Sequence, residues 1–138
     1  MPAKDVYHDG FKNALIKDGW EITRDPYTIR YEGLNLFADL AGKKLLSAQK
    51  EDTNIIVEIK SFLGRSPVHE FQCALGQYIL YQTLLSQIHP DYLLYLTIEK
   101  EIYETFFQRT AIKLVIEKYQ VLLLVIDINK EEIIQWIN

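Results

Sequence analysis

The stretch "NIIVEIKSF", residues 54–62, decides the fold of this chain, because its residue types alternate like those of a β-strand. Side chains two residues apart share one face of a strand. We therefore expect Glu58 and Lys60 on one face, between Ile56 and Phe62, with three more apolar residues on the opposite face. Charges bracketed by large apolar side chains indicate a half-buried cleft in which both charges need partners.

Residues 34–41, "LNLFADLA", show the same period of two, and we expect this strand to pair with residues 54–62 in a long hairpin or meander. The pairing brings the carboxylates of Asp39 and Glu58 together. Close carboxylates repel each other, and burial raises their pKa values, unless a cation is present. Oxygen ligands suit Mg²⁺ or Mn²⁺, so Asp39 and Glu58 are candidate metal ligands.

Lys60 lies two residues beyond Glu58, on the same face of the strand. In a metal-dependent site its ammonium group is placed to orient a water molecule, or to neutralise charge that develops on a phosphodiester. An ordinary surface ion pair between Glu58 and Lys60 explains the same spacing, and this alternative stays open.

The remaining segments alternate between helix and strand patterns. Helices are expected over residues 4–18, 67–87 and, in two pieces meeting near Thr110, 99–120. Ser66 and Pro67 mark the start of the second helix. Extended segments are expected over 20–33, broken at Asp25-Pro26 with the first piece at a sheet edge, and over 91–98 and 121–127, whereas 131–138 is a short strand or helix. The sum is an α/β domain with a central sheet flanked by helices.

Composition limits the class of protein. The 138 residues are 49% hydrophobic and carry a formal net charge of −4. One domain, 1–138, is expected at this length. The chain lacks the basic excess of an autonomous, non-specific nucleic-acid binder, so DNA contacts have to come from a local patch or a partner. The single cysteine, Cys73, and the lack of an apolar run of ~20 residues favour a cytoplasmic protein without membrane insertion.

Basic residues flank the expected cleft and are candidates for contacts with a DNA backbone. They are Lys43, Lys44, Lys50 and Arg65. A solvated hairpin tip explains the lysines slightly better, because Glu51 and Asp52 interrupt the positive charge.

The motifs "FADL" (37–40) and "VEIKSF" (57–62), followed by a helix that carries Gln77 and Tyr81, resemble the PD-(D/E)XK nuclease pattern. The resemblance implies a restriction-endonuclease-like fold: a mixed sheet with an α-β-β-β-α-β core and a C-terminal helix and strand added. It also implies Asp39 and Glu58 as metal ligands and Lys60 as the catalytic lysine. Gln77 and Tyr81 then form a supporting pair on the second helix.

The first helix departs from that pattern. Holliday-junction-resolvase-like members carry a glutamate about three turns before a Gly-aromatic pair, which is here Gly19-Trp20, and the matching position is His8, followed by Asp9. A histidine binds metals and shuttles protons, so the resemblance implies a supporting catalytic role for His8 in place of the usual carboxylate. The proline that gives the motif its name is replaced by Ala38, which is a minor departure.

Over nearly the whole chain, from "KDVYHDGFKNALIKDGW" (4–20) through "EIKSF" (58–62) to "IIQWI" (133–137), the sequence is similar to the XisH family of element-excision controlling factors. This resemblance implies action on DNA in programmed rearrangement, with a companion factor of the XisI family and a site-specific recombinase as expected partners. A non-catalytic accessory module that binds DNA or protein is the alternative. Homo-oligomerisation through exposed aromatic residues stays open.

Overall fold

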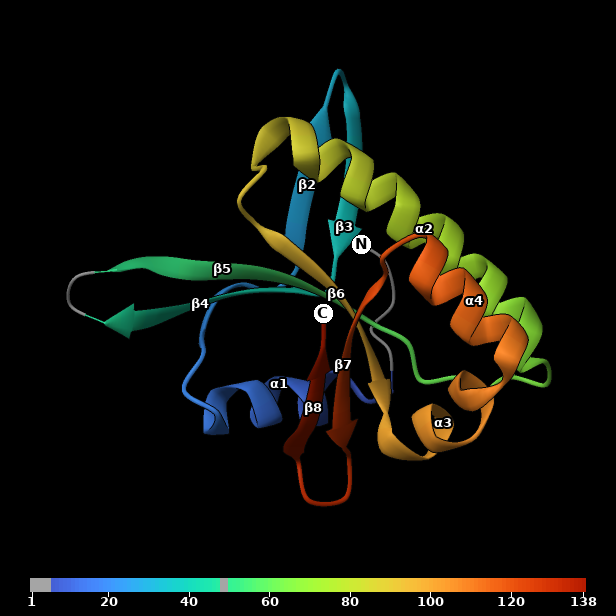
Figure 1. The fold of residues 1–138 in the computed structure, drawn as a ribbon. Coiled ribbons are helices and arrows are strands. Elements are labelled where there is room, and N and C mark those ends of the chain that lie inside the picture. The colour runs from blue at the N-terminus through green and yellow to red at the C-terminus, as the bar shows by residue number, and fades with distance from the viewer. Residues whose placement is uncertain (1–5, 48–49) are drawn as a thin grey trace.

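A computed structural model describes residues 6–47 and 50–138, without the side chains of 45–47 and 50–52. Figure 1 shows one mixed sheet with helices on both faces and a separate hairpin that projects from it. In chain order the elements are α1 (His8–Lys17), β1 (Glu21–Arg24), β2 (Tyr27–Tyr31), β3 (Leu34–Ala38), β4 (Leu40–Ser47), β5 (Lys50–Ile59), α2 (Pro67–Ile88), β6 (Leu93–Glu99), α3 (Lys100–Glu104), η1 (Phe106–Gln108), α4 (Thr110–Lys118), β7 (Leu122–Asp127) and β8 (Glu132–Ile137).

The main sheet has six strands in the order β1-β4-β5-β6-β7-β8. The pairs β1–β4, β4–β5 and β7–β8 are antiparallel, whereas β5–β6 and β6–β7 are parallel. Parallel neighbours need a crossover connection, and α2 supplies it between β5 and β6. When the β2–β3 hairpin is treated as an insertion, the elements α1, β1, β4, β5, α2 and β6 follow the expected α-β-β-β-α-β order. Helices and strands from α3 to β8 are then added at the C-terminal end.

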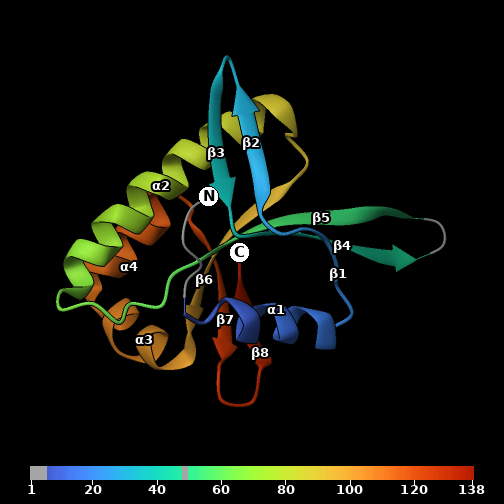
Figure 2. The ribbon, with the colours of Figure 1, turned by 180° about the vertical axis from the view of Figure 1, so that it is seen from behind.

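The alternation within β5 separates two cores. Ile55, Val57 and Ile59 pack with α1 on one face, and Figure 2 shows α1 lying across β7 and β8 on that side. Ile56 and Phe62 pack on the other face with α2 and η1. Full burial of an isoleucine or leucine contributes about 1.5–3 kcal/mol, so a one-residue slip of β5 would exchange both faces and is strongly disfavoured.

The expected single strand over 34–41 is wrong. Residues Leu34–Ala38 pair with Tyr27–Tyr31 in the separate hairpin, and a new strand starts at Leu40 to pair with β5. Asp39 lies between the two. The chain turns there because the hairpin leaves the main sheet and buries Ile29 and Ala38 in the core formed with α2.

The strand expected over 54–62 is also bounded differently. Strand β5 ends at Ile59, and its ladder with β6 closes with the Lys60 amide donating to the Thr97 carbonyl at 3.0 Å. Phe62 has a φ of +55°, so it is not strand, yet its ring reaches the same core as Ile56. The irregular connection expected between 42 and 54 is mostly strand, with β4 running to residue 47 and β5 starting at residue 50.

Several local expectations are confirmed. The side chain of Ser66 accepts a hydrogen bond from the His69 amide and caps α2, and β1 lies at the sheet edge. The 99–120 segment is divided before Thr110, and the last segment is a strand. Helix α1 begins at His8 rather than at residue 4; residues 4 and 5 lie outside the described part of the chain. Among the described helices, none has the length and apolar character needed to cross a lipid bilayer.

Candidate metal and phosphodiester site

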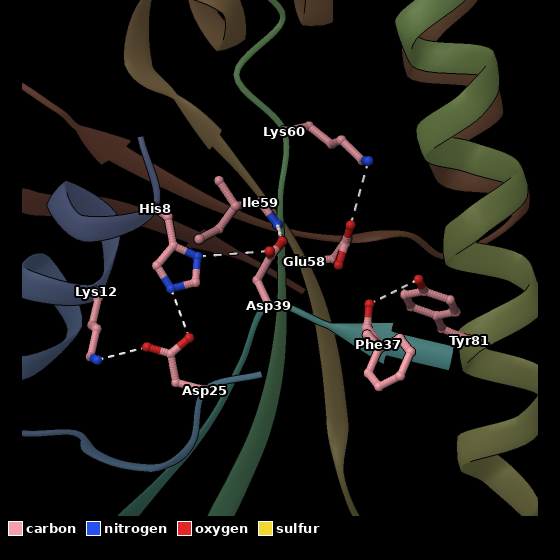
Figure 3. Close-up of polar contacts among 9 residues, drawn as sticks. All are labelled: His8, Lys12, Asp25, Phe37, Asp39, Glu58, Ile59, Lys60 and Tyr81. Atoms are coloured by element: carbon pink, nitrogen blue, oxygen red, sulfur yellow. Dashed lines mark hydrogen bonds and ion pairs between the residues drawn. The ribbon is translucent and has the colours of Figure 1, made fainter. Parts of the chain in front are cut away.

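Asp39 sits at the junction between the hairpin and the main sheet. The β4–β5 ladder places Leu40 opposite Val57, so Asp39 lies next to Glu58. One carboxylate oxygen of Asp39, Oδ2, accepts a hydrogen bond from the Ile59 amide at 2.7 Å. The side chain thus occupies the place of a ladder carbonyl, and Figure 3 shows it directed towards β5 rather than to solvent.

Glu58 is a carboxylic acid buried at the end of β5, with only 5% of the residue exposed. Lys60 places its ammonium nitrogen 3.4 Å from Glu58 Oε2. The other oxygen, Oε1, is buried and has no hydrogen-bond partner in the described structure. Burial, together with the negative charge of Asp39, raises the pKa of Glu58 to about 8, against the opposing effect of Lys60.

The two carboxyl groups form a coupled pair. Burial raises the pKa of Asp39 above its usual value, and the hydrogen bonds that it accepts from the Ile59 amide and from Glu58 oppose this rise. Glu58 is therefore the member that keeps a proton near neutral pH and donates it to Asp39. A divalent cation between the groups would favour ionisation of both, because it removes the repulsion that keeps the proton in place.

His8, from the first turn of α1, lies beside this pair and is itself buried. Its Nε2 is 2.9 Å from Asp25 Oδ1, and its Nδ1 is 3.7 Å from Asp39 Oδ1. A carboxylate only accepts, so Nε2–H donates to Asp25. Whenever the ring is neutral, Nδ1 is then an acceptor, and because it has no hydrogen-bond partner in the described structure, its lone pair is available to a ligand near Asp39.

Lys12 and Asp25 form a hydrogen-bonded network with His8. The sequence did not identify either of them as part of the site. Lys12 donates to Asp25 Oδ2 at 2.7 Å, and these two contacts fix the carboxylate that orients His8. Burial favours a higher pKa for Asp25, but the hydrogen bond from Lys12, the charge of His8 when its ring is protonated and the charge of Lys12 hold the pKa below its usual value. Lys12 follows His8 by four residues and so shares its helix face. Asp25 gives no such signal, because only the tertiary fold brings it to α1.

Gln77 and Tyr81 both belong to α2, and Figure 3 shows Tyr81 on the side of the site opposite His8. The Tyr81 hydroxyl donates to the Phe37 carbonyl at 3.0 Å and accepts from Gln77 Nε2 at 3.1 Å. Burial raises the pKa of Tyr81, and the charge of Glu58 adds to the rise. Phe37 precedes Asp39 by two residues, so this pair ties the end of β3 to α2 and helps to position Asp39.

Comparison with known proteins gives the family. Residues 1–134 match the family model described as XisH protein. The chain belongs to the XisH family.

Solved structures of XisH relatives have the same fold. An XisH family protein from Nostoc punctiforme PCC 73102 is 44% identical, with a TM-score of 0.87, and the match covers 97% of this chain and 100% of that one. An fdxN element excision controlling factor protein from Anabaena variabilis is also 44% identical, with a TM-score of 0.87 over 98% of this chain and 100% of that one. A search of curated proteins found no match.

The donor set of this XisH chain suits a hard cation with few protein ligands. Within residues 6–47 and 50–138, no three His, Cys, Asp or Glu side chains converge as a ligand cluster. Mg²⁺ nevertheless binds through one or two carboxylates and keeps several waters. Asp39 and Glu58 meet that requirement, and the unpaired Glu58 Oε1 is the buried oxygen that such an ion would satisfy. The residues therefore fit Mg²⁺ or Mn²⁺.

The candidate DNA-contact residues of the XisH chain lie in different places. Lys43 lines a groove between β4 and the turn that follows α2. Lys44 donates to the Asp18 carbonyl at 2.7 Å and lies over the Trp20 ring, so it is engaged at the end of α1. Arg65 is exposed in the segment before α2. The side chain of Lys50 lies outside the described part of the chain. Their contact with DNA stays a prediction.

Proposed function

We propose that this XisH family chain is an element excision controlling factor that cleaves DNA phosphodiester bonds with Mg²⁺ or Mn²⁺ at Asp39 and Glu58. The observation that carries the proposal is the buried carboxyl pair, in which Glu58 has a raised pKa and one oxygen without a hydrogen-bond partner. Perturbed acid pairs of this kind are concentrated at functional sites. The name printed for the Anabaena variabilis relative supports the role in element excision.

Lys60 and His8 have separate roles in the proposed hydrolysis. Water attacks phosphorus and gives up one proton, the bond from phosphorus to one bridging oxygen breaks, and the leaving oxygen takes up one proton, so that the step balances. A bound divalent ion supplies an acidified water and charge neutralisation in such sites. The Lys60 ammonium, beside Glu58, is placed to stabilise the negative charge that develops on the phosphate. His8, fixed through Asp25 and Lys12, presents an acceptor nitrogen next to Asp39.

The test is incubation of the purified protein with supercoiled, linear and branched DNA in Mg²⁺ or Mn²⁺, with EDTA as the blank. We expect Glu58→Gln and Lys60→Gln to lose cleavage. Glu117→Gln and Lys113→Gln, which make the same changes on exposed positions of α4, should cut like the parent. Equal nicking by all five proteins would assign the activity to a contaminant and refute the proposal.

One observation favours a second candidate, a non-catalytic accessory module that binds DNA or a protein partner. Within the described residues the site offers two carboxylates and no third acidic ligand, and Lys60 is paired with one of them. In that case Asp39 and Glu58 serve the structure of the junction, and a companion factor of the XisI family or a recombinase does the chemistry. Undetectable cleavage together with DNA binding unaffected by Glu58→Gln would favour this candidate.

A further inference from the structure

A groove lies further along β4 and β5 from Asp39 and Glu58, where these strands face the turn between α2 and β6. It consists of two adjoining hollows of about 360 and 320 Å³. Both hollows are lined by Arg24, Tyr27 and His89, so they lie side by side and are treated as one groove. Lys43 and Asn54 extend it along the sheet, and Arg30 extends it along the hairpin.

The lining is positively charged in a chain whose net charge is −4. It holds Arg24, Arg30 and Lys43, and among the described residues no Asp or Glu lines either hollow. Neither arginine forms an ion pair with a described carboxylate, and Arg24 donates to the Thr23 carbonyl at 2.7 Å. Asp25, next to Arg24 in sequence, is bound to His8 and Lys12. Lys43 lies opposite Glu21 in the β1–β4 ladder, so the charge argument is made from the two arginines.

The same groove presents aromatic rings. His89 and Tyr92 are stacked with ring centroids 4.2 Å apart and an angle of 7° between their planes. The Tyr92 amide donates to the His89 carbonyl at 3.0 Å, which holds the turn that carries both rings. Tyr27 faces them from β2. The turn formed by residues 89–92 contains one acidic residue, Asp91, which is exposed.

We propose that this groove binds an unpaired stretch of the DNA strand, with phosphates at Arg24 and Arg30 and a base on the rings of His89 and Tyr92. The proposal rests on the proposed function, because the bound strand would be the one that is cleaved at Asp39 and Glu58. A cationic groove with aromatic platforms is the arrangement that binds single strands, because every base has a π-face but a paired base does not expose it.

The groove lies at a distance from the carboxyl pair along the sheet, and Ile56, between Asn54 and Glu58 on the same face of β5, is fully buried. Asp39, just before β4, is four residues from Lys43, and Asn54 is four residues from Glu58 on β5. At about 3.3 Å per residue this is about 13 Å. The groove would therefore hold nucleotides a few positions away from the phosphodiester at the carboxyl pair, rather than the reacting phosphate itself.

The experiment is fluorescence anisotropy of a labelled single-stranded oligonucleotide, and of its duplex, in EDTA over a range of salt concentrations. We expect tighter binding of the single strand. Arg24→Gln and Arg30→Gln should each weaken binding and lower the slope of log K against log salt by about 0.7. Tyr92→Leu keeps an apolar side chain of similar size but removes the π-face, and it should weaken binding about fivefold or more.

The matched controls are Arg109→Gln and Tyr119→Leu, at exposed positions before and after α4. They should bind like the parent, and thermal unfolding checks that every variant is folded. Equal affinity of the groove variants and the controls would overturn the proposal, as would failure of the parent to bind DNA. Equal binding of single strand and duplex with no effect of Tyr92→Leu would overturn the assignment of an unpaired base.

Glu58→Gln separates this proposal from the proposed function. If the parent never cleaves DNA but the groove variants still lose binding, the nuclease proposal fails and the groove stands. If the parent cleaves, Glu58→Gln abolishes cleavage, and the groove variants bind and cut like the parent, the groove fails alone.

Discussion

Glu58 has an ionisable carboxyl group in a buried environment that disfavours its charged form. It is enclosed at the end of β5, faces Asp39, and has one ammonium group at 3.4 Å. Transfer of an unpaired carboxylate out of water costs several kcal/mol, so the group neutralises itself by keeping a proton. A buried carboxyl group lowers the stability of the fold, so its presence at this position is better explained by binding of a ligand than by packing.

The raised pKa predicts a pH dependence of stability. Between about pH 4.5 and about pH 8 the unfolded chain has ionised Glu58 while the folded chain keeps the proton. The folded state then binds more protons, so in EDTA the free energy of unfolding should fall as pH rises, by at most about 1.4 kcal/mol per pH unit from this residue. Urea unfolding at several pH values measures it.

Glu58→Gln should flatten that dependence, because the amide does not titrate. Glu117→Gln, on the exposed side of α4, should keep the slope of the parent. Parallel curves for the parent and Glu58→Gln would show that Glu58 is ionised in the folded state, contrary to the prediction.

At the scale of elements, α2 and the β2–β3 hairpin position Asp39. The hairpin leaves the main sheet, so its last strand needs a separate anchor, and the Tyr81 hydroxyl supplies one at the Phe37 carbonyl. Helix α2 also contributes Phe71, Ala74 and Leu85 to the core on that face. The position of the carboxyl pair therefore depends on contacts between α2 and a hairpin far from it in sequence.

Tyr81→Phe tests this anchor. Loss of the hydroxyl removes one hydrogen bond to Phe37 and one from Gln77, so we expect the free energy of unfolding to fall by about 1 kcal/mol. DNA cleavage should fall as well, since Asp39 loses part of its support. Tyr119→Phe removes an exposed hydroxyl from the end of α4 and serves as the control. Unchanged unfolding and cleavage in Tyr81→Phe would exclude the anchor.

The start of α2 gives an independent stability prediction. Ser66 accepts a hydrogen bond from the His69 amide at 3.2 Å, and Pro67 follows at the first helical position. Ser66→Ala should lower the free energy of unfolding by about 1 kcal/mol, as expected for loss of an N-cap. The comparison is Ser86→Ala near the other end of the helix, where the hydroxyl donates to the Thr83 carbonyl. An equal or larger loss at Ser86 would contradict the capping role.

At the scale of the whole molecule, the site joins four parts of the chain: α1, the β3–β4 junction, the end of β5, and α2. A metal bound there would hold them together and would bind the folded state selectively. By mass action, Mn²⁺ at a hundred times its dissociation constant should stabilise the fold by about 2.7 kcal/mol.

Thermal unfolding with and without Mn²⁺ measures this effect, independently of any DNA cleavage. The midpoint should rise for the parent and for Glu117→Gln, and should not rise for Asp39→Asn or Glu58→Gln. Mn²⁺ affinity should also increase with pH up to about pH 8, because Glu58 has to release its proton on binding. An equal rise in all four proteins would place the ion elsewhere.

The sequence by itself determined most helix and strand types, although not those of 42–54 and 131–138, because hydrophobic periodicity and capping residues are local properties. The two faces of β5, the cap at Ser66 and the break before Thr110 follow from neighbours within a few residues. The expected strand pairing brought Asp39 and Glu58 together, and the resemblance to known families added their roles as metal ligands. The sequence did not separate residues 34–38 from 40–47, since both parts alternate alike and only their partners differ.

Tertiary structure alone decided the rest of the site. The Asp25 contacts with His8 and Lys12, and the hydrogen bond from Tyr81 to Phe37, join residues whose separation in sequence follows no helix or strand period. The raised pKa of Glu58 depends on burial by several elements at once. The groove of Arg24, Arg30 and the His89–Tyr92 stack forms only where a hairpin, a sheet edge and a turn meet. Helix and strand patterns depend on neighbours in the sequence. Burial of Glu58 and the meeting of side chains that are distant in the sequence depend on the packing of the whole chain.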